Sequence, residues 1–169
     1  VSYGLACICA DCIYAVSGQD RRAVISNLRT IRASADEREL RRLARAVFRN
    51  FAKYLVDFFR FSLMTKEYID RHVTVHGKEF LAQAAATGKG VVVLSAHLGN
   101  WELGGAVISS LGFPLTGIAL SHRHDRINAF FTEQRRAGGV SIIETGRPSL
   151  RAAYTILRNN GFLGLIGDR

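Results

Sequence analysis

His97 and Glu102 are the two side chains of this sequence whose types and spacing could do chemistry. They lie five positions apart, directly after the apolar run at residues 91–96. Such a run predicts a buried strand, and the exits of strands in α/β sheets are where ligands and catalytic groups usually lie. A histidine beside a carboxylate can remove a proton from a hydroxyl group at neutral pH. The pair therefore predicts acid–base chemistry at the end of a strand.

The spacing of the pair indicates how it could work. Five residues correspond to about 500° of helix, so the two side chains cannot share one helix face. We expect His97 on a loop, with Gly99 and Asn100 turning the chain into a helix that Asn100 caps. Glu102 then lies in the first turn, where the helix dipole keeps it ionised. From there it could orient one imidazole nitrogen and leave the other as a general base. The alternative is a structural histidine.

Residues 88–169 alternate between short apolar runs and helical stretches. We expect strands at 91–95, 113–120, 140–143 and 162–167, and helices at 101–111, 125–136 (capped by Asp125) and 149–159. Strands and helices that alternate with short connections are typical of a parallel sheet. The predicted fold class is α/β: an N-terminal helical segment followed by a mostly parallel sheet flanked by helices.

Residues 1–87 read as helical. Ser34 and Glu37 have the spacing of a capping box and predict a helix start. The helix that follows has one apolar face, made of Leu40, Leu43, Val47, Phe51, Tyr54, Leu55 and Phe58. The opposite side is a basic stripe, made of Arg38, Arg41, Arg42, Arg45, Arg49 and Lys53. A basic amphipathic helix can lie on an anionic membrane, or its charges can be a solvated face over an ordinary core. Both interpretations stay open.

The charge and length of the chain limit its partners and its domains. Among 169 residues, 23 are Lys or Arg and 14 are Asp or Glu, a net charge of +9 that favours polyanions such as phosphorylated ligands or an anionic membrane. We expect a membrane-proximal helical region at 1–87 and an α/β catalytic core at 88–169, together forming one continuous domain. The chain starts with Val1 and stops just after an apolar run, so we expect a C-terminally truncated core.

All three cysteines, Cys7, Cys9 and Cys12, fall within the apolar segment at residues 1–16. A zinc site needs a fourth ligand, and the neighbouring residues are mostly apolar. We therefore predict no metal, and interpret the cysteines as small apolar side chains of a buried or membrane-adjacent helix. The segment is too short to span a bilayer, which takes about 20 apolar residues.

The sequence His-Leu-Gly-Asn-Trp-Glu at 97–102 resembles the H-x4-D/E block of the glycerolipid acyltransferase superfamily. It is most similar to the block of the bacterial lipid A biosynthesis (lauroyl/myristoyl) acyltransferase family. Further similarity lies in the helical region around Phe48-Arg49-Asn50, in Gly88-Lys89-Gly90 before the first strand, and in the strand at 161–168 that leads to Asp168. The resemblance extends over nearly the whole chain.

This resemblance implies a glycerolipid acyltransferase-like fold and transfer of a fatty acyl chain from an acyl carrier protein or coenzyme A thioester. The acceptor would be a hydroxyl of a membrane glycolipid, a lipid A precursor first of all, at the cytoplasmic face of a bacterial inner membrane. His97 would be the general base and Glu102 would orient it, with no cofactor. The resemblance also assigns substrate binding to the residues Asn100, Arg123, Arg136, Arg147, Arg151 and Asp168, with Arg135 as a further candidate.

Two other functions fit the same sequence. The first is acylation of a different glycolipid, such as a phosphatidylinositol mannoside. The second is a non-catalytic basic module that binds membranes or nucleic acid. Nucleic-acid modules use a reading element or a platform of stacking aromatic side chains, and the one tryptophan, Trp101, lies inside the His–Glu block. We therefore expect no nucleic-acid partner.

Overall fold

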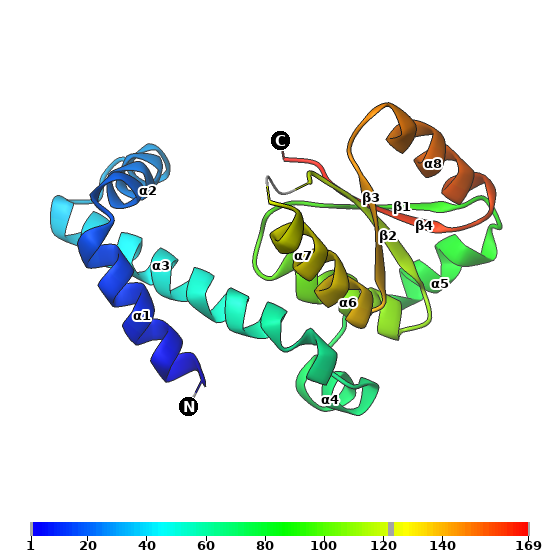
Figure 1. Cartoon of the computed structure of the whole chain (residues 1–169), viewed down its shortest axis with the longest axis horizontal. Helices are drawn as coiled ribbons and strands as arrows, with labels where there is room; N and C mark the ends of the chain where they lie inside the picture. Colours follow the sequence, from blue (N-terminus) through cyan, green and yellow to red (C-terminus); the bar gives the residue numbers. More distant parts are fainter. Residues whose placement is uncertain (1, 122–123, 169) are drawn as a thin grey trace. The chain divides into compact units, whose positions relative to one another are not determined.

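The computed structural model describes residues 2–121 and 124–168 (Figure 1). The chain forms two compact units, one ending at Asp57 and the other beginning at Phe58. This division differs from the one expected at 87/88, because the segment that follows Asp57 contributes to the core of the second unit. Within the described residues, no helix combines the length and the apolar character needed to cross a membrane.

The first unit consists of helices, namely α1 (Ser2–Val16), α2 (Gly18–Ile31) and most of α3 (Glu37–Phe59). The predicted capping box is wrong. The carboxylate of Asp36 accepts a hydrogen bond of 2.7 Å from the backbone N–H of Glu39, so Asp36 caps α3 in place of Ser34. Glu37 does not reach back over the first turn, because its carboxylate pairs with Arg29 of α2.

The faces of α3 differ in part from the predicted pattern. Leu40 and Phe58 are buried, as expected, and Ala44 is buried with them. Val47 and Phe51, which were predicted to face the core, are exposed. The predicted basic stripe is not uniformly solvated, since two of its arginines bind a carboxylate of α1.

The second unit begins with three short helical segments, η1 (Phe61–Leu63), α4 (Lys66–His72) and α5 (Lys78–Ala86). Strands and helices then alternate in the order β1 (Val91–Ser95), α6 (Trp101–Ser110), β2 (Leu115–Ala119), α7 (Asp125–Ala137), β3 (Val140–Glu144), α8 (Arg147–Arg158) and β4 (Phe162–Ile166). All four strands are parallel, in the order β1-β4-β2-β3, and helices flank the sheet (Figure 1). The predicted α/β fold with a parallel sheet is confirmed.

Several element boundaries differ from the predictions by one or two residues. The strand expected from residue 113 begins at Leu115, because Pro114 has no N–H with which to join the sheet. Asp125 is the first residue of α7, and the capping position falls on His124, whose side chain makes no capping hydrogen bond.

An aromatic cluster forms the core of this unit. Phe58 and Phe61 are buried against Ala106 of α6, and Leu103 and Phe131 pack around them. The rings of Phe58 and Phe131 lie 4.8 Å apart between centroids. This cluster joins α6 to α7, the two helices that carry the charged pair described below.

Candidate active site

The pairing of β1 with β4 places His97 beside Asp168. The two strands are parallel neighbours in which Ser95 faces Ile166, and the backbone N–H of Gly167 donates a 2.8 Å hydrogen bond to the carbonyl of Ser95. His97 and Asp168 each follow two residues later, so both leave the sheet at its carboxyl edge.

The carboxylate of Asp168 binds His97 through two hydrogen bonds. Nδ1 of the ring lies 2.8 Å from Oδ1, and the backbone N–H of His97 donates to Oδ2 over 3.0 Å. These bonds, the ring contact first, lower the pKa of Asp168 below its ordinary value, because both stabilise the ionised form. An ionised carboxylate can only accept, so Nδ1 donates to it, and in a neutral imidazole of this tautomer Nε2 is the nitrogen that carries the lone pair. This is the tautomer that a general base requires.

The imidazole is held on one side and open on another. The Trp101 ring stands edge-on to it, with centroids 4.8 Å apart. The His97 side chain nevertheless keeps 36% of its surface exposed. The His97 side chain is therefore partly accessible to solvent.

The turn from the loop into α6 is as predicted. Gly99 has a φ of 64°, which glycine adopts without strain. Asn100 caps the helix, and its side chain accepts a 3.1 Å hydrogen bond from the backbone N–H of Leu103. The backbone at the end of β1 can thus bring His97 out on a short loop.

Glu102 does not make the expected orienting contact with His97. Its carboxylate binds the guanidinium of Arg135 on α7 through two nitrogens, at 2.6 to 3.1 Å. In the described part of the chain no hydrogen bond joins Glu102 to His97. The orienting contact belongs to Asp168, because β4 is the neighbour of β1 in the sheet whereas the first turn of α6 faces α7. A catalytic role for Glu102 stays a prediction.

The Glu102–Arg135 pair is largely buried, with side-chain exposures of 12% and 14%. The guanidinium of Arg135 also lies over two rings of the aromatic cluster, 6.0 Å from the centroid of Phe58 and 5.7 Å from that of Phe131. A bidentate contact of this kind fixes both direction and distance. It anchors the helix that begins directly after the His97 loop.

The other predicted substrate-binding residues either lie away from the His97–Asp168 pair or lie outside the residues that the structure describes. Arg136 is exposed and pairs with Glu133 on its own helix, and Arg151 is exposed on α8. Arg123 and the side chain of Arg147 lie outside the described residues. Substrate binding by these four arginines and by Asn100 stays a prediction.

Sequence reasoning assigned Asp168 to substrate binding and missed its contact with His97. The two residues are 71 positions apart. Only the order of the strands brings them together, and short apolar runs carry no information on that order. The Glu102–Arg135 pair was missed for a similar reason. Residues that meet when α6 packs against α7 have no characteristic separation in the sequence.

A histidine held by an aspartate at the carboxyl edge of a parallel sheet defines an α/β protein with a candidate acid–base site. The chain belongs to the family of bacterial lipid A biosynthesis acyltransferases, whose sequence pattern matches residues 4–169. This confirms the resemblance seen at the His-Leu-Gly-Asn-Trp-Glu block.

Two curated relatives are similar to a large part of the chain. A phosphatidylinositol mannoside acyltransferase of Mycolicibacterium smegmatis (strain ATCC 700084 / mc(2)155) is 26% identical over 130 residues, which are 75% of this chain and 43% of the relative. A protein of the same name from Mycobacterium tuberculosis (strain CDC 1551 / Oshkosh) is 24% identical over 129 residues, 73% of this chain and 41% of the relative. The matched region is less than half of either relative.

Proposed function

We propose that this protein transfers a fatty acyl chain from a thioester to a hydroxyl group of a membrane glycolipid. The observation that carries the proposal is the His97–Asp168 pair, in which the ring nitrogen away from the aspartate can act as a base. Membership of an acyltransferase family and the names of the two relatives agree with this reaction class.

The proposed reaction needs no nucleophile from the protein. Nε2 of His97 takes the proton of the acceptor hydroxyl while the hydroxyl oxygen attacks the thioester carbonyl carbon. The tetrahedral intermediate collapses, the carbon–sulfur bond breaks, and the departing thiolate takes the proton from the imidazolium. An ester and a free thiol result. Asp168 holds the ring in place and stabilises the imidazolium while it carries the positive charge.

The acceptor is proposed to be a phosphorylated glycolipid. The excess of basic residues, with a net charge of +9, suits a lipid that carries negative charge. The family match favours a lipid A precursor, and the two relatives favour a phosphatidylinositol mannoside as a second candidate. We propose the cytoplasmic face of a bacterial inner membrane as the location and an acyl carrier protein as the acyl donor, with coenzyme A as the other possible carrier.

The test uses membranes that contain the full-length protein or its His97→Gln variant. They are incubated with labelled acyl carrier protein thioester or acyl-coenzyme A, and with each acceptor in turn, and the products are identified by mass. We expect one acceptor to gain one acyl chain with the native protein, and the rate to fall at least about 100-fold with His97→Gln. An unchanged rate would contradict the role of His97, and no acylation of either lipid would contradict the proposed acceptor class.

A further inference from the structure

Trp101 is the one tryptophan of the chain, and its ring contacts the candidate base. It is the first residue of α6, four positions after His97. The centroids of the two rings lie 4.8 Å apart, and their planes make an angle of 76°. Aromatic rings attract each other most in edge-to-face or offset arrangements with centroids about 4.5 to 7 Å apart. The contact is therefore attractive and directional.

The hydrogen bonds from His97 to Asp168 do not by themselves fix the direction of Nε2. One of them comes from the backbone N–H of His97, at 3.0 Å, and holds the loop rather than the ring. The other holds the ring at a single atom, since Nδ1 lies 2.8 Å from Oδ1 of Asp168. A ring held at one nitrogen can still pivot about that bond, and each pivot moves Nε2 on the far side of the ring. A second contact on the ring removes this freedom, and Trp101 supplies it.

The position of Trp101 is set by its neighbours in the chain. Asn100 caps α6 by accepting a 3.1 Å hydrogen bond from the backbone N–H of Leu103. On the other side of Trp101, the carboxylate of Glu102 binds Arg135 of α7 in a largely buried ion pair. The backbone of Trp101 therefore cannot shift without disturbing the cap or the ion pair. In this way α6 and α7 together determine where the indole ring meets the imidazole.

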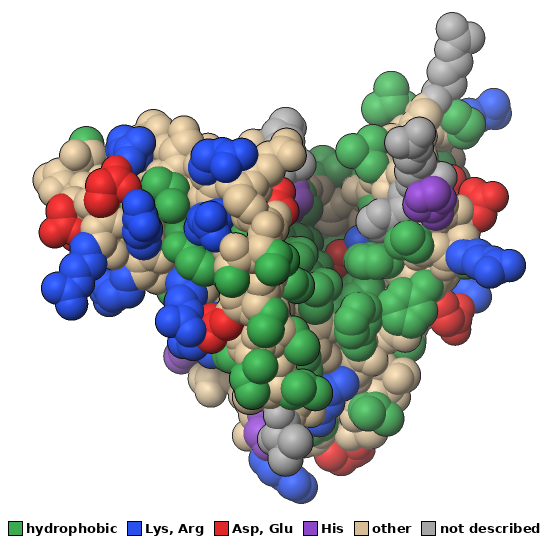
Figure 2. Space-filling model, turned by 60° about the vertical axis from the view of Figure 1, so that its left-hand side comes forward, with side chains coloured by type: hydrophobic (Ala, Val, Ile, Leu, Met, Phe, Trp, Pro, Cys, Tyr) green, Lys and Arg blue, Asp and Glu red, His purple; other side chains and the backbone are tan. Residues whose placement is uncertain are grey.

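Exposure alone does not distinguish Trp101 from other hydrophobic residues. Many hydrophobic side chains are open to solvent, and Figure 2 shows a number of them on one face of the protein. Phe80 and Tyr154, for example, are 68% and 65% exposed. Trp101 is partly buried instead, and it has a defined ring partner. Its contact with His97, rather than a general apolar character, is what indicates a role.

We propose that Trp101 is a positioning residue for the candidate base. Its ring keeps the imidazole of His97 against the carboxylate of Asp168, so that Nδ1 stays the donor and Nε2 stays directed toward the acceptor hydroxyl. Trp101 takes no proton itself and acts through the orientation of His97. A displacement of about 1 Å at a catalytic group can lower a rate by up to about 100-fold, so a ring contact that prevents pivoting is sufficient to affect turnover.

The role of Trp101 rests on the proposed function, because a positioned base has a use only in proton transfer. A measurement on the imidazole itself separates the two. Histidine side chains labelled with the heavy isotope of nitrogen report by NMR which ring nitrogen carries the proton. His97→Gln identifies the signals of His97 among the five histidines of the chain. In neutral His97 of the native protein we expect the proton on Nδ1, because the ionised carboxylate of Asp168 only accepts.

Trp101→Leu should allow the imidazole to turn away from Asp168. We expect the population with the proton on Nε2 to rise at least about threefold in this variant. Trp101→Phe keeps an aromatic ring and should resemble the native protein. Circular dichroism establishes that both variants are folded. Unchanged populations in folded Trp101→Leu would overturn the proposal, whether or not the protein transfers acyl chains.

The native protein offers a second test that needs no substitution of Trp101. Because the chain has a single tryptophan, all of its tryptophan fluorescence comes from this site. A protonated imidazole in ring contact quenches indole emission, and imidazole ordinarily changes charge between about pH 5 and 8. The emission should therefore fall as the pH is lowered through this range in native protein and stay constant in His97→Gln. The same pH dependence in both proteins would show that the two rings are not in contact, and the proposal would be wrong.

Steady-state kinetics measure the consequence for turnover. We expect Trp101→Leu to lower kcat at least about tenfold while the KM values of donor and acceptor change less than about twofold, and Trp101→Phe to keep kcat within about threefold of native. The matched control is Phe113→Leu. It removes the ring contact of Phe113 with Phe162, whose centroids are 5.2 Å apart, at the opposite edge of the sheet, because Phe113 precedes β2 whereas His97 follows β1. Its kcat should be native. A loss of kcat that follows the loss of melting temperature equally in Trp101→Leu and Phe113→Leu would show a structural role only and contradict the proposal.

Discussion

His97 and Asp168 meet because each lies two residues beyond a pair of facing residues, Ser95 and Ile166, on neighbouring parallel strands. The register of the sheet therefore sets the geometry of the candidate base. Glu102, which is much closer to His97 along the chain, binds Arg135 instead. The two carboxylates have different partners, and their replacement should have different consequences.

Replacement of Asp168 by asparagine should impair turnover more than folding. An amide keeps the size of the side chain but cannot stabilise an imidazolium, and its NH2 group can impose the wrong ring tautomer. We expect kcat to fall at least about 100-fold, with little change in KM or in the melting temperature. Steady-state kinetics with a saturating acyl donor measure the effect. A variant with near-native kcat would show that the Asp168 contact does not serve the base.

Replacement of Arg135 by methionine should instead destabilise the fold. Methionine preserves contact with the rings of Phe58 and Phe131, but it leaves the carboxylate of Glu102 largely buried without its cation. Removal of one partner of a buried ion pair costs about 3 kcal/mol or more. Urea denaturation of the full chain measures this change in the free energy of unfolding.

The matched control is the double variant Glu102→Gln, Arg135→Met. It no longer buries a charge, so we expect it to recover a substantial part of the lost stability. Equal stability of the single and double variants would mean that the ion pair contributes little to the attachment of α6 to α7.

The sequence predicts the elements of this fold better than their arrangement. The run at Val91–Ser95 is a strand as expected, and Asn100 caps the next helix, because local patterning and capping chemistry act over a few residues. The expected burial of this strand is wrong, since Val92 and Leu94 are exposed. Strands joined by helices can be ordered in several ways in a sheet. No local sequence pattern therefore predicts that β1 pairs with β4. For this reason the sequence indicates His97 as a candidate base but assigns the orienting contact to Glu102, whereas in the structure Asp168 makes that contact.

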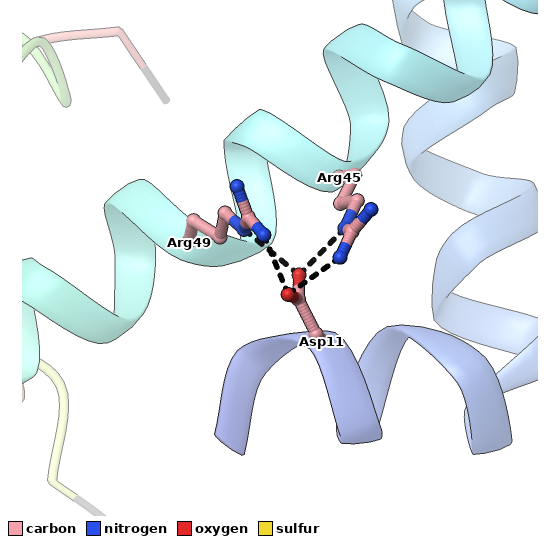
Figure 3. Close-up of polar contacts among 3 residues, drawn as sticks. All are labelled: Asp11, Arg45 and Arg49. Atoms are coloured by element: carbon pink, nitrogen blue, oxygen red, sulfur yellow. Dashed lines mark hydrogen bonds and ion pairs between the residues drawn. The ribbon is translucent and has the colours of Figure 1, made fainter. Parts of the chain in front are cut away.

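The exposure of α1 shows a second limit. Hydropathy predicts a buried or membrane-adjacent helix at residues 1–16, and in the structure Leu5 and Val16 are exposed and not buried. Which side of α1 faces the other helices of its unit depends on where the residue that pairs with another helix lies. Asp11 pairs with two arginines of α3 (Figure 3), so the side of α1 that carries its one charged residue faces α3.

Asp11→Asn should destabilise the first unit in a pH-dependent way. The hydrogen bonds from Arg45 and Arg49 hold the pKa of Asp11 far below its ordinary value of 3.8. A carboxyl group with a lowered pKa in the folded state stabilises the protein above the unfolded-state pKa, and this contribution is lost as pH falls through the folded-state pKa. The native protein should therefore exceed the variant in melting temperature at pH 7.

The same linkage predicts that the difference between native protein and Asp11→Asn begins to shrink only below about pH 4. Thermal melts followed by circular dichroism at pH 7, 5 and 3 test this dependence. Asp20→Asn is a control on a neighbouring helix, because Asp20 accepts a hydrogen bond from the hydroxyl of Ser17 and forms no ion pair with an arginine of the described residues. A difference between native protein and Asp11→Asn that is the same at all three pH values would contradict the assigned cause.

Gly90 and Gly88 provide a matched pair for the packing at the start of β1. Both have positive φ, 69° and 62°, so alanine is strained at either position. A methyl group on Gly88 meets open space, whereas one on Gly90 would lie 2.8 Å from the carbonyl carbon of Leu157 and closer to its oxygen. We expect a loss of about 1 kcal/mol for Gly88→Ala and of ~3 kcal/mol for Gly90→Ala, since only the second adds a backbone clash to the strain. Urea denaturation measures the free energy of unfolding of both variants. Equal losses would show that the backbone at the end of α8 can shift to make room for a methyl group at the start of β1.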